Sequence, residues 1–394
     1  MTDEEKYIRM RLCKAAVQSI PFYLFRIFPI RKNKIVFTTI EGTTGFTCNP
    51  KYIALELLKE DTGHELVWLV NDMTKEFPDG IKKVKNTLLN RAFHLTTARF
   101  WIDNSRKQLE VRKRKGQTYI QTWHAKLGFK PTGLDRGASF TKIAYLVTKH
   151  DSDMIDLWLS NSDWYDNTLK TGSLYEGKTL RSGSPRCDVL INDVDRCREK
   201  VRKKWNLPFD AKILMYAPTF RSGSQTTSRS VEVGNHFPDY LRLKASLEKK
   251  FGGQWYIMLR LHPQLVARNL DQGVADASII DGSRVDDMYE VLAGCDAFMT
   301  DYSSAAFDAM VMKMPIFLYA DDYKEYEGER GSLLWDLKEL PFPLAENDDE
   351  LDKVVSDFDE GKYREELLKL FSDTGMVEDG KASDRVVDCL KTLK

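Results

Sequence analysis

The stretch AFMTDYSSAAFD, residues 297–308, decides the fold of this chain. Its apolar run ends abruptly at Thr300, the hydroxyls of Ser303 and Ser304 follow, and the remainder has a helical pattern. In open α/β sheets, ligands bind outside the carboxyl ends of parallel strands, and a helix N-terminus offers unpaired N–H groups to an anion. Asp301 or Ser303 could simply cap the helix, but two adjacent hydroxyls exceed what capping needs. The stretch therefore predicts a strand-to-helix turn that binds phosphate.

Three further apolar runs end in polar clusters. The run Thr118–Trp123 leads into His124, and Lys126 and Lys130 follow in a glycine-containing loop. A lone histidine is usually structural, with its nitrogens satisfied by the protein. The neighbouring lysines favour a site where His124 moves a proton beside a bound phosphate.

The other two runs belong to the second half of the chain. One ends at Pro218-Thr219, which breaks the strand and directs Arg221 outward. The other ends in Arg260 and His262, just before a proline that terminates the strand. A strand-end histidine satisfied by the protein and a surface arginine are the plain alternatives, but the pairing of cations at strand ends favours ligand binding.

Composition excludes several classes of protein. The 394 residues suit two domains, and 42% hydrophobic residues supply ample core. Equal numbers of basic and acidic residues, 59 of each, disfavour nucleic-acid binding. The six cysteines lack CxxC spacing, which indicates reduced thiols rather than disulfides or a zinc site. We expect no metal site and no required cofactor, and leave stimulation by a divalent cation open.

Strands and helices alternate along both halves, which predicts an α/β fold with two doubly wound parallel sheets. We expect Rossmann-like domains over residues 34–188, on the acceptor side, and 189–394, on the donor side. Histidines at strand ends in both halves favour domains that face a common cleft, the glycosyltransferase-B type of architecture. The expected strands are Ile35–Thr39, Leu66–Val70, Phe100–Ile102, Thr118–Trp123, Leu157–Ser160, Lys212–Ala217, Trp255–Leu261, Ala297–Thr300 and Ile316–Tyr319.

Residues 1–33 form a separate basic segment. Eight Lys and Arg and no acid lie between Lys6 and Lys34, around apolar residues that include Phe22, Leu24 and Phe28. Prolines interrupt the segment, and its longest apolar run is shorter than a helix needs to span a bilayer. It is typical of an amphipathic helix lying on an anionic membrane surface. The alternative is a helix packed on its own domain with solvated charges.

Taken together, the strand-end motifs resemble the CDP-glycerol glycerophosphotransferase family of teichoic-acid and capsule polymerases. The resemblance covers roughly residues 34–370. The segments that carry it are Tyr119–His124, Gly183–Asp188, Tyr216–Arg221, Arg260–Pro263 and Asp296–Asp308.

The resemblance implies a transferase of the glycosyltransferase-B fold. An acceptor hydroxyl would attack the β-phosphorus of CDP-glycerol, extending a membrane-linked polymer and releasing CMP. His124 would be the general base. We expect catalytic roles for His124 and His262, and substrate contacts from Lys126, Arg186, Pro218, Thr219, Arg221, Arg260, Thr300, Ser303, Ser304 and Asp308.

The chain departs from the family pattern at two places, of which the first bears on the donor and the second is minor. His124-Ala125-Lys126 stands where many members have His-Gly-Thr, and Cys187 stands where asparagine is usual. CDP-ribitol as donor, a UDP-sugar glycosyltransferase on the same fold, and a non-catalytic nucleotide-sugar-binding subunit remain the alternatives. The expected location is peripheral, on the cytoplasmic face of the cell membrane, with a lipid-linked polymer acceptor as partner; self-association is left open.

Overall fold

The computed structural model describes residues 2–219, 237–261, 276–323, 326 and 333–393. The chain divides into two compact units. Unit 1 comprises residues 1–126, 132–188 and 375–394, and unit 2 comprises residues 127–131 and 189–374. Each unit is built around one parallel sheet, so the predicted α/β class with two parallel-sheet domains is confirmed.

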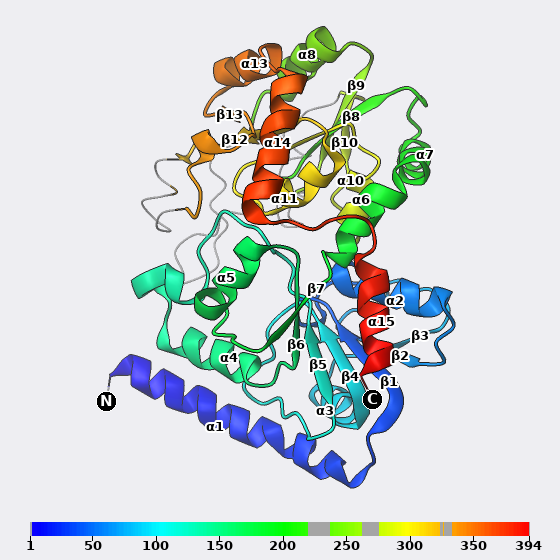
Figure 1. Ribbon diagram of the computed structural model, residues 1–394, viewed down its shortest axis with the longest axis vertical. Coiled ribbons are helices and arrows are strands. Elements are labelled where there is room, and N and C mark those ends of the chain that lie inside the picture. The colour runs from blue at the N-terminus through cyan, green and yellow to red at the C-terminus, as the bar shows by residue number, and fades with distance from the viewer. Residues whose placement is uncertain (1, 220–236, 262–275, 324–325, 327–332, 394) are drawn as a thin grey trace. The chain divides into compact units, whose positions relative to one another are not determined.

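The sheet of unit 1 has seven parallel strands in the order β3-β2-β1-β4-β5-β6-β7 (Figure 1). Side chains alternate between its two faces. Val36 and Trp101 belong to the core on one face, and Ile35 and Trp68 to the core on the other. The strands are β1 (Arg31–Thr38), β2 (Glu65–Val70), β3 (Ile81–Lys85), β4 (Ala98–Asp103), β5 (Thr118–Gln121), β6 (Leu157–Ser160) and β7 (Lys178–Arg181).

Helices cover both faces of this sheet. Side-chain caps begin several of them: Thr87, Thr141 and Ser162 each accept a hydrogen bond from a backbone N–H of the first turn. The C-terminal helix α15 returns to unit 1, where it packs against α2. The α-helices are α1 (Asp3–Leu24), α2 (Cys48–Lys59), α3 (Leu88–Thr97), α4 (Lys142–Ser152), α5 (Asp163–Gly172) and α15 (Ala382–Thr392).

Unit 2 contains a six-stranded parallel sheet in the order β10-β9-β8-β11-β12-β13. Its strands are β8 (Lys212–Tyr216), β9 (Trp255–Leu259), β10 (Ile279–Asp281), β11 (Ala297–Thr300), β12 (Ile316–Tyr319) and β13 (Leu344–Ala345). Among the described residues its α-helices are α7 (Val194–Lys204), α8 (Tyr240–Phe251), α10 (Met288–Leu292), α11 (Ala305–Ala309), α13 (Asp348–Ser356) and α14 (Glu360–Thr374). The short helix α6 (Asp188–Asn192) begins at the division between the units.

The units differ from the predicted domains in three segments, of which residues 1–33, predicted as a separate segment, belong to unit 1. The division after Asp188 lies where the sequence placed it, but residues 127–131 pack with unit 2 and residues 375–394 with unit 1. Residues 127–131 belong with unit 2 because the ring of Phe129 packs against that of Phe307, with 4.8 Å between the ring centres. Residues 375–394 belong with unit 1 because Val386 and Val387 of α15 are part of its hydrophobic core.

The N-terminal segment is a helix, but its amphipathic character is not borne out. A capping box between Thr2 and Glu5 begins α1, and Ile8, Ala15 and Phe22 lie on its buried side. Exposed apolar side chains alternate with basic ones around the rest of the helix, so they form no separate apolar stripe. Within the described residues, we find no helix with the length and apolar character needed to cross a membrane.

Candidate active site

His124 lies at the carboxyl edge of the unit 1 sheet, three residues beyond β5. Trp123, directly before it, has a left-handed backbone with φ of 49°, which a non-glycine residue adopts only when its surroundings hold it there. The Nδ1 atom of His124 lies 2.8 Å from the backbone carbonyl oxygen of Asn104. Because a carbonyl only accepts, Nδ1 carries the proton and Nε2 is the basic nitrogen.

The electrostatic setting keeps His124 neutral. Burial lowers its pKa to about 4, and the positive charges of Arg186 and Arg106 act in the same direction against the hydrogen bond to Asn104. A neutral imidazole with a free Nε2 is the form that accepts a proton. Since Nδ1 faces a carbonyl, this base has no carboxylate orienting it.

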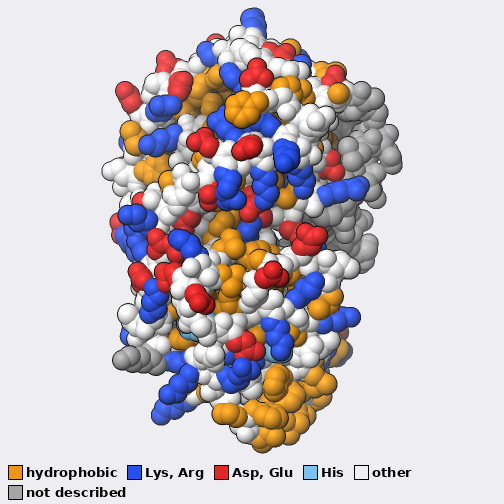
Figure 2. Space-filling model, turned by 90° about the vertical axis from the view of Figure 1, so that its right-hand side faces the viewer, with side chains coloured by type: hydrophobic (Ala, Val, Ile, Leu, Met, Phe, Trp, Pro, Cys, Tyr) orange, Lys and Arg blue, Asp and Glu red, His pale blue; other side chains and the backbone are white. Residues whose placement is uncertain are grey.

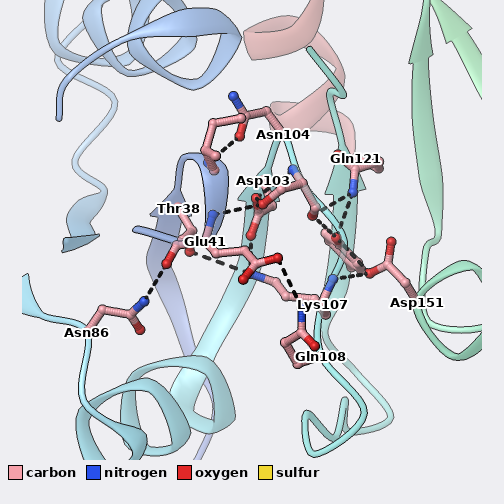
Figure 3. Close-up of polar contacts among 12 residues, drawn as sticks. Thr38, Glu41, Asn86, Asp103, Asn104, Lys107, Gln108, Gln121 and Asp151 are labelled. Carbon is pink, nitrogen blue, oxygen red and sulfur yellow. Dashed lines mark hydrogen bonds and ion pairs between the residues drawn. The ribbon is translucent and has the colours of Figure 1, made fainter. Parts of the chain in front are cut away.

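A buried polar network lies beneath the strand ends that carry His124 (Figure 3). Asp103, at the end of β4, forms an ion pair with Lys107, and both side chains are buried. The backbone N–H of Lys107 donates to Asp151 Oδ1 at 2.8 Å, and the hydroxyl of Tyr119 donates to the same oxygen at 3.0 Å. Gln121 Nε2 then donates to the Tyr119 hydroxyl at 2.8 Å.

This network reaches the backbone that positions His124. Gln121 Oε1 accepts from the N–H of Trp123 at 3.0 Å. On the other side, Asn49 Nδ2 donates to the carbonyl of Trp123 at 2.7 Å. The strained residue before His124 is therefore held at both its N–H and its C=O. Asn49 and Gln121 belong to the site, yet sequence reasoning gave neither a role. Only the fold brings Asn49 to Trp123, and Gln121 lies inside the predicted strand Thr118–Trp123.

Arg186 lies near the same edge of unit 1. It belongs to a 3-10 turn over Pro185–Cys187, its backbone N–H donates to Asn49 Oδ1 at 3.1 Å, and its guanidinium contacts Cys48 Sγ at 3.5 Å. Asn49 thus ties Arg186 and Trp123 together. The positive charge of Arg186 contributes to the lowered pKa of His124, so the two side chains lie near each other in unit 1.

The predicted cationic loop after His124 has a different structure. Lys126 is buried in unit 1, where its ammonium donates to the carbonyl of Leu159 and lies 5.1 Å from the Tyr165 ring centre. Burial lowers the pKa of Lys126 to about 7. Lys130 packs in unit 2, 5.5 Å from the ring centre of Tyr326. The loop is therefore not one cationic patch, because each lysine is held by its own unit.

In unit 2 the turn after β11 joins the end of β8. The Thr300 hydroxyl donates to the Ala217 carbonyl at 2.7 Å. The carboxylate of Asp301 accepts from the backbone N–H of Thr219 at 2.9 Å and also from the Thr219 hydroxyl. Pro218 lies between these contacts, partly exposed. Asp301 therefore fixes Thr219, three residues after the end of β8.

The two serines of this turn remain partly exposed. Ser304 is the N-cap residue of α11, but its side chain makes no capping hydrogen bond. The Ser303 hydroxyl accepts from the N–H of Ala305 at 3.3 Å. The helical pattern after the serines forms a five-residue α11 followed by a 3-10 turn, so the helix dipole is short and the hydroxyls must supply more of any anion binding.

Arg260 and Asp308 are both anchored inside unit 2. Arg260 donates through Nη1 to the carbonyls of Gly282, at 2.6 Å, and Val285, and burial lowers the pKa of its guanidinium. Asp308 Oδ2 accepts from the Tyr289 hydroxyl at 2.6 Å. Arg221 and His262, the other predicted site residues of this half, lie outside the described residues. Within the described part of the chain, no group of His, Cys, Asp and Glu side chains is arranged to hold a metal ion.

The sequence and the fold agree with one class of protein. The family model described as CDP-Glycerol:Poly(glycerophosphate) glycerophosphotransferase matches residues 20–392, and the chain belongs to this family. Among curated relatives, the teichoic acid poly(glycerol phosphate) polymerase of Staphylococcus epidermidis is 28% identical over 378 residues, covering 92% of this chain. The chain spans about half of that relative's length, 51%.

Two further comparisons extend over nearly whole chains. The teichoic acid glycerol-phosphate transferase of Staphylococcus aureus is 28% identical over 368 residues, with 90% of this chain and 92% of that protein covered. Solved structures of the wall teichoic acid polymerase TagF match with a TM-score of 0.80 and 26% identity, covering 99% of this chain and 98% of the other. One of them is a histidine-to-asparagine variant soaked with CDPG.

Proposed function

We propose that this protein transfers glycerol phosphate from CDP-glycerol to a hydroxyl of a membrane-linked, teichoic-acid-type acceptor. Membership of the glycerophosphotransferase family supports this function, as do the strand-end polar clusters in both units. The observation that carries it is His124, neutral, with Nδ1 fixed on Asn104 and Nε2 left as the base.

In the proposed step, the acceptor hydroxyl oxygen forms a bond to the β-phosphorus of CDP-glycerol while its proton passes to His124 Nε2. The bond between that phosphorus and the bridging oxygen breaks, and CMP leaves with the electron pair. Phosphoryl transfer depends on positioning and charge stabilisation rather than covalent catalysis. Thr219, Ser303 and Ser304 would contact the donor phosphates in unit 2. We assign the remaining donor contacts, together with a glycosyltransferase-B arrangement of the two units, by the family relationship.

The deciding experiment measures CMP release from CDP-glycerol by the full chain with an acceptor-containing membrane fraction. CDP-ribitol and a UDP-sugar serve as parallel donors. We expect CMP release from CDP-glycerol, and a loss of more than about 100-fold in His124→Ala, because general-base catalysis contributes roughly 10²–10⁴-fold. His64→Ala is the matched control, since His64 is a partly buried histidine beside β2 that contacts Thr62. UDP release, or a fully active His124→Ala, would refute the proposal.

We further propose that unit 1 binds the anionic cytoplasmic leaflet through the end of α1 and the following turn η1 (Phe25–Ile27). Apolar side chains are exposed here: Ile27 at 83%, Leu24 at 63%, and Leu89 of α3 at 60%. Figure 2 shows a broad hydrophobic area at the lower end of unit 1, where these elements lie in Figure 1. Arg26 and the basic residues beginning β1 provide the charge complement for anionic lipids. This surface replaces the helix-long amphipathic face that the sequence predicted.

A further inference from the structure

Asn104 follows β4 and is completely buried, and two neighbouring strand ends converge on it. Its backbone carbonyl accepts the hydrogen bond from His124. Its side-chain Oδ1 accepts from the backbone N–H of Ile40, at 2.8 Å, just beyond β1. A backbone N–H only donates, so the atom facing Ile40 must be the amide oxygen. The orientation of the Asn104 amide is therefore fixed by its partner.

The amide nitrogen of Asn104 consequently points the other way. In Figure 3, Nδ2 is directed away from the other residues drawn. It is buried and finds no hydrogen-bond acceptor among the residues that the structure describes. Leaving a buried donor unsatisfied costs about 1–3 kcal/mol, and most buried polar groups are paired. A donor retained at this cost, on the residue whose carbonyl orients the proposed base, calls for a ligand.

The backbone around Asn104 is held in an unfavourable conformation. Ile40 has φ of 42° and Glu41 has φ of 56°, in the left-handed region that a β-branched residue such as Ile40 rarely adopts. Two hydrogen bonds keep this turn in place: Ile40 N–H to Asn104, and Glu41 N–H to Ser105 Oγ at 3.0 Å. Strain of this kind persists where the surroundings over-determine it, and it concentrates at functional sites.

We propose that Asn104 is a substrate-binding residue whose Nδ2 donates a hydrogen bond to a phosphate oxygen held beside His124. The oxygen belongs either to the β-phosphate of the donor or to the terminal phosphate of the acceptor. The inference rests on the proposed function. Asn104 then acts twice: its carbonyl sets the tautomer of the base, and its amide places the phosphate relative to that base.

Asn104→Asp tests this role with little change in shape. One carboxylate oxygen still accepts from Ile40, while the other replaces the donor with an acceptor that repels phosphate. We expect kcat/KM to fall about 10- to 150-fold, the range for losing a hydrogen bond to a charged group. Asn167→Asp is the matched control, because it makes the same charge change at an exposed position of α5, in the same unit. It should keep wild-type kinetics.

Binding measurements distinguish the two phosphates. Calorimetric affinity for CDP-glycerol falls in Asn104→Asp if the donor phosphate is the partner, whereas an unchanged donor affinity with a raised acceptor KM identifies the acceptor phosphate. If Asn104→Asp fails to fold, Asn104→Ser, which removes the amide nitrogen without adding charge, should show the same losses.

The outcomes separate this inference from the proposed function. A folded Asn104→Asp or Asn104→Ser protein with wild-type kinetics and affinities would overturn the inference alone and leave water as the partner of Nδ2. A wild-type chain that neither binds nor consumes CDP-glycerol would overturn the proposed function, and with it the inference.

Discussion

Replacing Lys107 by methionine should destabilise unit 1 strongly. The side chains of Lys107 and Asp103 are only 6% and 2% exposed, and they form an ion pair at the centre of the network under His124. Methionine preserves the length of the side chain but leaves the Asp103 carboxylate buried without its cation. Breaking one partner of a buried pair costs about 3–5 kcal/mol. We expect that loss in the free energy of unfolding.

A double variant tests this reasoning by also removing the negative charge of Asp103. In Lys107→Met with Asp103→Asn, the amide oxygen still accepts the hydrogen bond that Asp103 receives from the N–H of Ser105. Replacing both members of a buried pair by neutral groups is often close to neutral, so the double variant should recover most of the loss. This recovery separates an electrostatic cost from a packing cost.

Hydrogen exchange of peptides from β4 and β5, measured with increasing urea, reports unit 1 separately from unit 2. Lys149→Met is the control, since Lys149 pairs with Asp153 at 49% and 57% exposure, where ion pairs contribute about 0–1 kcal/mol. If Lys107→Met costs no more than Lys149→Met, or if the double variant is as unstable as the single one, the reasoning about the buried pair is wrong.

Three further outcomes can be measured directly. Ser303→Ala with Ser304→Ala should weaken CDP-glycerol binding more than cytidine binding in calorimetry, because cytidine lacks the diphosphate; equal losses would contradict the placement. Ile27→Glu should release the protein from anionic vesicles in a sedimentation assay, whereas Phe209→Glu, equally exposed at 83% in unit 2, should not. Burial raises the pKa of Asp151 to about 7, above its ordinary value of 3.8, so its ionisation should reduce wild-type stability as pH rises from about 4 to 7; Asp151→Asn should lack that contribution in urea titrations at several pH values.

The central strands could be predicted because burial on both faces leaves a continuous apolar signature. The strands β8, β9 and β11 lie within one or two residues of the predicted ranges. The edge strand β3, with the sequence IKKVK, was missed because its three lysines face solvent wholly or in part and interrupt any apolar run. The edge strand β7, KTLR, was missed for the same reason. Their pairing depends on neighbouring strands rather than on their own composition.

The candidate site was predictable only in part. His124, Ser303 and Ser304 stand out because each follows an apolar run. Asn104 also follows an apolar run, Phe100–Ile102, but its role depends on the fold, which brings it to Ile40, 64 residues away in the sequence. Lys126 illustrates the opposite error, because a lysine after a strand end suggests an exposed cation, yet its ammonium is buried against the carbonyl of Leu159.

The low basicity of His124 leads to a final prediction about pH. A base with pKa about 4 is a weak acceptor for a hydroxyl proton. Such a base suits a loose phosphoryl-transfer transition state, in which the nucleophile needs little activation before its bond forms.

In the free protein the acid limb of the pH profile of kcat/KM should therefore lie near pH 4, because the pKa of His124 is well below the ordinary histidine value of 6.5. Bound phosphate places negative charge beside the ring and favours the imidazolium, so the acid limb of kcat should lie at a higher pH than that of kcat/KM. CMP release measured from pH 3 to pH 8 separates the two limbs, and coincident limbs near pH 6.5 would show that neither burial nor bound phosphate controls this histidine.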